Sequence, residues 1–300
     1  MRSRLKIILL GMVVLLSFLP QMEVPYLSTL VLFIFMYAVL AESWNILSGY
    51  TGYFSFGHVT FFGVGAYGSG IFIAKLGWHW SVAALMGGMW ALLLALVVGY
   101  PLLRLKGPFF AISMLGLSQT MRLSALIFGR LTGGGLGMSL PPVQNLSEIY
   151  YAMGTVALIV SLCAYYIDRS KFGLSLIAIR EDEIAAAATG IHTERYKYIA
   201  FLLSAIFPGI VGGVYGTYLS YLHPDEMFSL GFNIKMIIMP ILGGAGTFLG
   251  PIIGAVALSV ISEILWVKFP FFHLGLYGII IVILVLYLPN GITGLFQRRD

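Results

Sequence analysis

Charged side chains are scarce in this 300-residue sequence, in which 17 Lys and Arg and 12 Asp and Glu make up 10% of the chain, against 59% hydrophobic residues. A soluble domain carries roughly 25% charged residues. The scarcity therefore excludes an ordinary soluble domain and predicts a chain that is solvated mostly by lipid. The net charge of +5 comes from Lys and Arg in a few loops, not from a basic face mixed with aromatics, so no nucleic acid is expected as a partner.

Signatures of catalysis and cofactor binding are also missing. The single cysteine, Cys163, excludes an internal disulfide. The nucleotide-binding pattern G-x-x-x-x-G-K-[ST] occurs nowhere, even though Leu131–Met138 is rich in glycine, so this chain is not expected to hydrolyse a nucleotide. No spacing of His, Cys and Asp predicts a metal site, and no catalytic pair lies close in sequence. We therefore expect neither enzyme activity nor a cofactor in this chain.

Apolar segments, by contrast, are abundant, and about ten of them approach the ~20 residues that a helix needs to cross a bilayer. The sequence predicts an all-α membrane protein with about ten transmembrane helices, or eight to nine if the first and eighth segments do not cross. The basic start, Arg2 to Lys6, resembles a signal peptide, but no cleavage site of small residues follows, so we expect an attached first helix. The predicted crossings are Leu5–Leu19, Tyr26–Leu47, His58–Ala74, Ser81–Pro101, Pro108–Phe128, Ile149–Ile167, Tyr198–Leu222, Gly231–Leu249, Pro251–Val267 and His273–Leu288.

The placement of basic residues predicts the orientation of the chain. If the N-terminus is cytoplasmic, ten crossings put twelve Lys and Arg in cytoplasmic segments and three, Lys75, Arg130 and Lys268, in outer segments. This bias follows the positive-inside rule, and it requires an even number of crossings. We expect a multi-pass protein of the cell (inner) membrane with both termini in the cytoplasm.

Two similar stretches predict an inverted internal repeat. Phe54–Gly57 (FSFG) and Phe228–Gly231 (FSLG) share a pattern, and the same offset of 174 residues aligns the second crossing with the seventh and the fourth with the ninth. The aligned crossings run in opposite directions, so residues 26–128 and 198–296 would be inverted halves of one domain that covers residues 1–300. Transporters often combine such halves with broken helices, and the pathway then lies between the halves.

Glycines and small polar residues cluster at matching places in the two halves. Trp44–Gly70 contains seven glycines, and Leu242–Gly254 is the corresponding stretch. In a membrane helix, glycine either lets neighbouring helices pack closely or permits a break that lines a polar cavity, and the sequence leaves both interpretations open. Under the second interpretation, the candidates for the translocation path are Asn45, Ser55, Gly57, His58, Gly243 and Gly244.

A few ionisable residues fall inside the predicted spans, among them Glu42, Arg122 and Lys235. A charge at such depth costs roughly 2.5–3.5 kcal/mol and usually faces the protein interior or a cavity. No chain of carboxylates crosses the bilayer, which argues against a carrier driven by protons.

The one long hydrophilic segment, Asp168–Lys197, holds ten of the 29 charged residues. Within this hydrophilic loop, residues 174–188 can form a helix that ends at Gly190, and Thr193 can cap a second helix that leads into the seventh crossing. The pattern predicts either a compact loop that docks a partner or a solvated loop with local helix.

Five segments carry a joint pattern: Ala178–Gly216, Trp44–Gly70, Leu131–Met138, His223–Pro251 and Leu286–Phe296. Together they resemble LivM-type permeases of ABC importers for branched-chain amino acids. The similarity covers most of the chain from about Asn45 onward. Glu42 departs from the family pattern, in which this position is more often apolar, and its role is left open.

The resemblance implies the permease subunit of an ATP-driven importer for branched-chain or related amino acids. Its partners would be two ABC ATPase subunits that bind ATP, a second homologous permease and an extracytoplasmic substrate-binding protein. The hydrophilic loop would then contain a cytoplasmic coupling helix. Candidates for coupling to the ATPases are Arg180, Glu181, Asp182, Glu183, Ala186 and Gly190, and candidates for facing the binding protein are Arg130, Asp225 and Glu226.

Two alternatives remain open at this point. One is a secondary transporter driven by an ion gradient, which would have no need of a docking loop. The other is an ABC permease for urea, amides or another small polar solute, which would share every feature named so far.

Overall fold

The computed structural model describes residues 19–22, 25–143, 145–269, 272, 275, 278, 279, 282 and 291–297. Long helices dominate it, and eight segments in this described part are long and apolar enough to cross a membrane. The predicted all-α membrane fold is thereby confirmed. Of the predicted crossings, Leu5–Leu19 lies outside the described residues except for Leu19, and His273–Leu288 lies outside them almost entirely.

The eight segments reproduce the second to ninth predicted crossings. They are α2 (Pro25–Trp44) extended by the π-helix η2 (Asn45–Gly49), α3 (Val59–Leu76), α4 (Trp80–Leu103), α5 (Pro108–Ile127), α7 (Leu146–Arg169), α10 (Thr193–Leu219), α11 (Pro224–Met227) with α12 (Leu230–Gly243), and α13 (Gly250–Lys268). The remaining helices are η1 (Leu19–Met22), α6 (Gly129–Thr132), η3 (Gly134–Leu136), α8 (Lys171–Glu181), α9 (Glu183–Ala188) and α15 (Gly291–Gln297).

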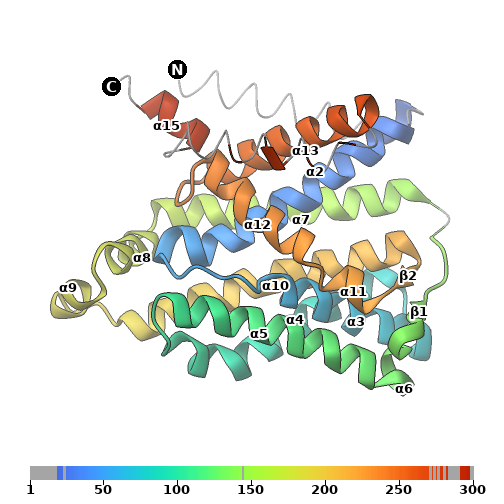
Figure 1. The fold of residues 1–300 in the computed structure, drawn as a ribbon, viewed down its shortest axis with the longest axis horizontal. Coiled ribbons are helices and arrows are strands. Elements are labelled where there is room, and N and C mark those ends of the chain that lie inside the picture. The colour runs from blue at the N-terminus through green and yellow to red at the C-terminus, as the bar shows by residue number, and fades with distance from the viewer. Residues whose placement is uncertain are drawn as a thin grey trace.

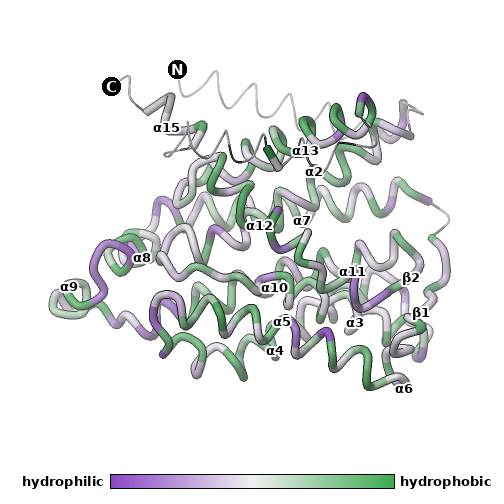
Figure 2. The backbone as a smooth tube through the Cα atoms, viewed as in Figure 1, coloured by the Kyte–Doolittle hydropathy of each residue, from purple (hydrophilic) through white to green (hydrophobic). Residues whose placement is uncertain are grey.

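The short elements gather at two opposite ends of the helix bundle (Figure 1). One end, here called the α9 end, carries α8 and α9, and the turn between them is among the most hydrophilic parts of the chain (Figure 2). The other, the hairpin end, carries α6, η3 and α11 together with β1 (Met138–Ser139) and β2 (Tyr221–Leu222). The two strands pair antiparallel, with Met138 opposite Leu222, so they join two loops that lie far apart in sequence.

The helices α3, α4 and α10 pack with their backbones in direct contact. A methyl group at Gly65 would overlap the carbonyl oxygen of Gly209, and one at Gly87 would lie 2.5 Å from the carbonyl oxygen of Gly65. Only glycine permits this approach, in which dispersion contacts between backbones replace side-chain packing. The close-packing role of glycine is therefore confirmed for this part of the bundle.

Two helices begin inside the bundle instead of at its ends. After η2, residues 52–58 form a non-helical segment that runs from the α9 end toward the middle of the bundle, where α3 starts (Figure 1). There His58 Nε2 lies 2.9 Å from the carbonyl oxygen of Ser204, about midway along α10. The helix α12 also starts inside, where Asn233 donates a hydrogen bond to the carbonyl oxygen of Phe56. From this meeting point α3 runs to the hairpin end and α12 to the α9 end (Figure 1).

The eighth predicted crossing, Gly231–Leu249, was placed too far along the chain. The helix begins at Leu230, where the Ser229 side chain accepts a hydrogen bond from the N–H of Phe232 and so caps it. It ends at Gly243, because Gly244 has a φ of 123°, which other residues rarely adopt. Residues 244–249 are a loop between α12 and α13.

Candidate functional site

Asn45 links the two glycine-rich stretches at the α9 end. Its Nδ2 donates to the carbonyl oxygen of Thr247 at 3.0 Å, and its Oδ1 accepts from the N–H of Gly246 at 2.7 Å. Asn45 is only 1% exposed, and a methyl group added at Gly49 would lie 2.8 Å from the nitrogen of Gly246. The end of the α2–η2 helix and the α12–α13 loop thus form one close contact, here called the glycine junction (Asn45, Gly49, Gly52, Gly246 and Thr247).

Arg180, at the end of α8, reaches across this glycine junction. Its Nη1 donates to the carbonyl oxygen of Gly49 at 3.0 Å, while its Nη2 pairs with Glu181 at 3.1 Å. A methyl group at Gly246 would lie 2.5 Å from Nη1, and one at Gly52 would lie 2.9 Å from Cγ. The glycines therefore leave the space that the arginine side chain occupies, and the hydrophilic loop contacts both glycine-rich stretches through one residue.

Three polar side chains form a closed set of contacts next to Arg180. Lys197 Nζ lies 2.5 Å from Glu183 Oε1 and donates to the Tyr53 hydroxyl at 2.8 Å, and that hydroxyl donates to Glu183 Oε2 at 2.8 Å. The Lys197 side chain is 3% exposed and that of Glu183 21%. This Tyr53–Glu183–Lys197 triad connects α9, the 52–58 segment and the first turns of α10.

The two charges of the triad, on Glu183 and Lys197, compensate each other. Partial burial by itself would raise the pKa of the Glu183 carboxyl, but hydrogen bonds from Lys197 and Tyr53 and the positive charges of Lys197 and Lys106 outweigh it and lower the pKa below its ordinary value of 4.5. Glu183 is therefore ionised at neutral pH, and the buried ammonium group of Lys197 has its counter-charge within contact distance.

The six residues predicted to couple to ATPases lie on different sides of the loop. Arg180 and Glu183 reach into the bundle, and Ala186 is buried, with 5% of its surface exposed. Glu181, Asp182 and Gly190 are exposed, and Asp182 caps α9 by accepting hydrogen bonds from two backbone N–H groups. Their coupling role stays a prediction, but the structure separates three inward-facing residues from three outward-facing ones.

The exposed side of α9 is apolar. Ile184 is 77% exposed, and Ala185, Ala187 and Ala188 are exposed beside it. An isolated helix of six residues gains little stability in water, and its small side chains leave a smooth surface. The run Ala185–Ala188 predicts a smooth surface of small side chains in this loop, and the structure adds the exposed Ile184 beside it.

The residues predicted for the translocation path are mostly buried and packed. Ser55 donates its N–H to the Ser48 hydroxyl at 3.2 Å and accepts at its carbonyl from the Trp44 indole at 2.9 Å. A methyl group at Gly57 would overlap the carbonyl oxygen of Met114 in α5. The two glycines of the second stretch, Gly243 and Gly244, pack against Gly250 and Gly291. None of these contacts tests the predicted role in translocation.

The 52–58 segment also has an exposed side, which the sequence did not predict. Phe54 and Phe56 are 43% and 44% exposed, whereas Tyr53, Ser55 and Gly57 between and beside them are buried. This alternation is that of an extended chain with one buried face. The period of two is visible in the sequence FSFG, but it covers too few residues to stand out.

The residues predicted to face a binding protein lie together at the hairpin end. Arg122 Nη1 and Asp225 Oδ1 form an ion pair of 2.6 Å between α5 and α11. Lys75 of α3 donates a hydrogen bond to the carbonyl oxygen of Arg130 in α6. Glu226 follows Asp225 in α11, so the three predicted residues occupy the end of the bundle opposite α9.

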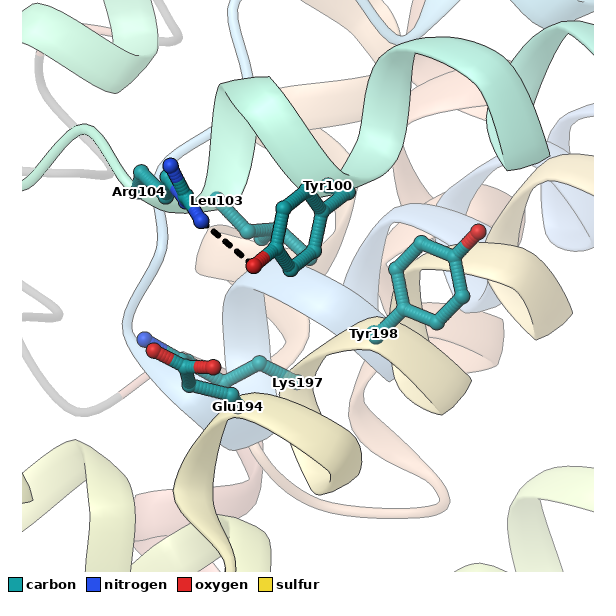
Figure 3. A pocket seen from close by; sticks show the side chains of 6 residues that line it. All are labelled: Tyr100, Leu103, Arg104, Glu194, Lys197 and Tyr198. Atoms are coloured by element: carbon teal, nitrogen blue, oxygen red, sulfur yellow. Dashed lines mark hydrogen bonds between the residues drawn. The ribbon is translucent and has the colours of Figure 1, made fainter.

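A small pocket opens beside the triad, between the ends of α4 and α10 (Figure 3). Arg104 lies 4.4 Å over the ring of Tyr100 and donates a hydrogen bond to its hydroxyl. The facing wall comes from α10 and places Glu194 and Lys197 side by side (Figure 3). Leu103 and Tyr198 complete the lining. The pocket therefore leaves space around the first turns of α10, where Lys197 holds α9.

Comparison with known proteins agrees with this architecture. Residues 26–286 match the family described as "Branched-chain amino acid transport system / permease component". The chain is 26% identical over 288 residues to the high-affinity branched-chain amino acid transport system permease protein LivM of Salmonella typhimurium, covering 86% of this chain and 67% of that protein. It is 25% identical over 289 residues to the permease protein LivH of Escherichia coli, covering 86% and 91%.

A more distant similarity covers part of the chain. Over 121 residues, 36% of this chain and 38% of the relative, it is 27% identical to the guanosine ABC transporter permease protein NupQ of Bacillus subtilis. No solved structure matches the chain significantly.

Proposed function

The chain belongs to the family of permease components of branched-chain amino acid transport systems, and from this premise we propose that it is the membrane subunit of an ATP-driven importer for branched-chain or related amino acids. The observation that carries the proposal is the hydrophilic loop, which is folded into α8 and α9 and contacts the broken membrane helices through Arg180 and Glu183. A carrier driven by an ion gradient has no need of such a loop.

We propose that the exposed apolar side of α9 docks onto an ATPase subunit. Ile184 and the alanines beside it offer a smooth surface that a groove can enclose, and the exposed Glu181 and Asp182 lie at its edge. Removing such apolar surface from water stabilises an interface by roughly 25 cal/mol per Å². Two ATPases, one for each of two permeases, complete the expected cytoplasmic side of the importer.

A second permease would cover α5 and the exposed side of the 52–58 segment. Non-helical backbone at membrane depth is tolerated only where protein covers it or where it lines a polar cavity, and Phe54 and Phe56 are exposed on such backbone. The helix α5 lies alongside, because the ring of its Phe110 packs at 5.3 Å on that of Tyr53. The outward side of α5 presents a stripe at helical spacing, consisting of Phe109, Ile112, Gly116, Thr120, Leu123 and Ile127.

The translocation path is therefore proposed to run between the two permeases, along α5 and the 52–58 segment. This placement rests on the exposed Phe54 and Phe56, whereas the predicted path residues Ser55, Gly57 and His58 of the same segment are buried. The inverted halves are also proposed on geometric grounds. The helices α2 and α10 run in opposite directions, and so do α3 and α12, which meet where Asn233 contacts Phe56.

We assign the α9 end to the cytoplasm and the hairpin end to the outside. The basic residues of the α4–α5 connection and of the hydrophilic loop lie at the α9 end, as the positive-inside rule requires. The loops that contain Arg130, Asp225 and Glu226 would then receive the substrate-binding protein.

Reconstitution in liposomes tests this function. The chain is purified in mild detergent with its ATPases and second permease, inserted into liposomes, and supplied with binding protein and radiolabelled leucine. We expect uptake that depends on ATP and on the binding protein, with none when the ATPases carry an inactivating substitution. Preferential uptake of urea or an amide would contradict the amino-acid substrate. Uphill transport by this chain alone, driven by an ion gradient, would contradict the whole proposal.

A further inference from the structure

We propose that the Tyr53–Glu183–Lys197 triad is the device through which α9 positions the 52–58 segment, so that a displacement of α9 is passed to the membrane helices. The proposal rests on the function proposed above, because it assumes that an ATPase moves α9. It assigns a transmission role to Tyr53 and Lys197, and it gives Glu183 an inward role in place of direct contact with the ATPase.

The side-chain hydrogen bonds that hold α9 against the membrane helices depend on one residue, Glu183. The helix consists of Glu183, Ile184 and four alanines. Glu183 accepts a hydrogen bond from Tyr53 Oη. Among the described side-chain hydrogen bonds, this is the one that joins α9 to a part of the chain outside the hydrophilic loop. Its second contact, with Lys197, fixes α9 to the start of α10. Movement of α9 must therefore either carry these contacts along or break them.

Tyr53 in turn leads into the middle of the membrane. In the five residues that follow it, the Ser55 carbonyl oxygen accepts from Trp44 of α2, the Phe56 carbonyl oxygen accepts from Asn233 of α12, and His58 lies against the Ser204 carbonyl oxygen of α10. The segment thus contacts three membrane helices within a few residues. Because these three contacts follow Tyr53 within five residues, a displacement at Tyr53 acts on all three helices.

The two inward contacts of the hydrophilic loop come from two different helices. Arg180 fixes the end of α8 to the glycine junction, whereas Glu183 fixes the start of α9 to the triad. Between them Asp182 has an extended backbone, with φ −158° and ψ 109°, which separates the two helices. An ATPase that pushes on α9 would therefore act on the triad while α8 stays on the glycine junction.

The chemistry of the triad allows its parts to be removed one at a time. Replacing Tyr53 with Phe removes two hydrogen bonds but keeps the Lys197–Glu183 ion pair and the ring that packs on Phe110. Replacing Glu183 with Gln removes the counter-charge of a lysine that is 3% exposed, which is the harsher change because a buried charge loses its partner. The Tyr53→Phe variant is therefore expected to fold and assemble, and it carries the main test.

The test measures uptake per ATP hydrolysed in the assembled importer, reconstituted with its ATPases, second permease and binding protein. Tyr53→Phe and Glu183→Gln are expected to lower this ratio by about fivefold or more, as the loss of one or two hydrogen bonds implies. In the double variant the ratio of uptake to ATP hydrolysed should be no lower than in the more impaired single variant, because both changes interrupt the same connection. Matched controls are Tyr50→Phe, which removes the hydrogen bond to Asp168, and Glu148→Gln at the exposed start of α7.

An unchanged ratio of uptake to ATP hydrolysed in Tyr53→Phe would overturn the proposal. So would a fall of uptake and ATP hydrolysis in parallel with a lower melting temperature, since the triad would then only stabilise the fold. If Glu183→Gln fails to assemble, Tyr53→Phe alone decides. Failure of the proposed function would look different, because the wild-type chain would then not retain ATPases or would transport without them.

Discussion

Among single residues, the charged run Arg180–Glu183 shows how neighbouring side chains acquire opposite surroundings. Arg180 contacts the backbone of Gly49 and Glu183 the buried Lys197, while Asp182 between them caps α9 and Glu181 is exposed. Arg180 ends α8 and Glu183 begins α9, and the extended backbone of Asp182 between them sets the direction in which each side chain leaves the loop. The two inward contacts therefore follow from the break between the helices and not from helical spacing.

Gly65 offers a test of backbone contact between helices. Gly65→Ala is expected to destabilise the purified chain by roughly 1–3 kcal/mol, because the added methyl group overlaps the Gly209 carbonyl and must force α3 and α10 apart. Thermal unfolding in detergent measures the change as a lower melting temperature.

The matched control is Gly116→Ala, on the outward side of α5. A methyl group there has nothing within 4 Å, so the variant should melt at the wild-type temperature or slightly above it, since alanine favours a helix. Equal melting temperatures for the two alanine variants would show that the α3–α10 contact is looser than described.

Sequence reasoning reached part of the candidate site. Charge density located the hydrophilic loop, and the FSFG pattern located the 52–58 segment, because both depend on local composition. It missed Tyr53 and Lys197, since each is unremarkable alone and they lie 144 residues apart in the chain. It named Ala186 as a coupling candidate but could not predict its burial, because the burial of one alanine in a run of four depends on how α9 packs on its neighbours.

At the scale of elements, the crossings were predictable and their interruptions were not. Apolar length identified eight spans to within a few residues at most boundaries. The end of α12 was misplaced because Leu242–Leu249 is apolar enough to continue a span, whereas Gly244 and Gly246 take positive φ angles that end it. Backbone conformation at glycine follows from tertiary contacts, here with the α2–η2 end, that a local pattern does not contain.

Gly190 provides the test at this scale, because the turn between α9 and α10 depends on its φ of 90°. Gly190→Ala meets no neighbouring atom and should cost only about 1 kcal/mol, with a modest loss of uptake. Gly190→Pro also loses the N–H donated to the Ala187 carbonyl and cannot reach this φ, so it should abolish ATP-dependent uptake.

Uptake and the amount of inserted protein are measured together for these variants. Gly107→Ala is the control, since Gly107 also has a positive φ with open space around it but lies in the α4–α5 connection. If Gly190→Pro transported as well as the wild type, the turn would have no part in coupling. Loss of inserted protein would instead show that the turn is needed for folding.

At the scale of the whole molecule, the bundle has two chemically different ends. The α9 end presents a small helix with an apolar outer face, and the hairpin end presents paired loops with the Arg122–Asp225 ion pair. That ion pair is 31% and 59% exposed, so it contributes little stability, roughly 0–1 kcal/mol, and serves mainly to orient α11. The two ends of the bundle therefore present different surfaces, as the proposed assembly requires.

The orientation can be tested with single cysteines, because the chain has only Cys163. In a Cys163→Ser background, Ile184→Cys and Leu136→Cys place a thiol at positions that are 77% and 88% exposed, one at each end. A maleimide that cannot cross the membrane should label Leu136→Cys from outside intact cells, and Ile184→Cys only after the membrane is opened. The reverse pattern would invert the proposed topology.

The short helix α12 has a consequence for how the protein is made. Its 14 residues span about 21 Å at 1.5 Å per residue, less than the ~30 Å of a hydrocarbon core. Only together with α11 does it form the 20-residue span Pro224–Gly243 that is long enough to cross. Within this span Lys235 donates a hydrogen bond at 2.9 Å to the hydroxyl of Tyr37, which belongs to α2. We therefore expect the insertion of this span during synthesis to depend on α2 being already in place to receive its lysine.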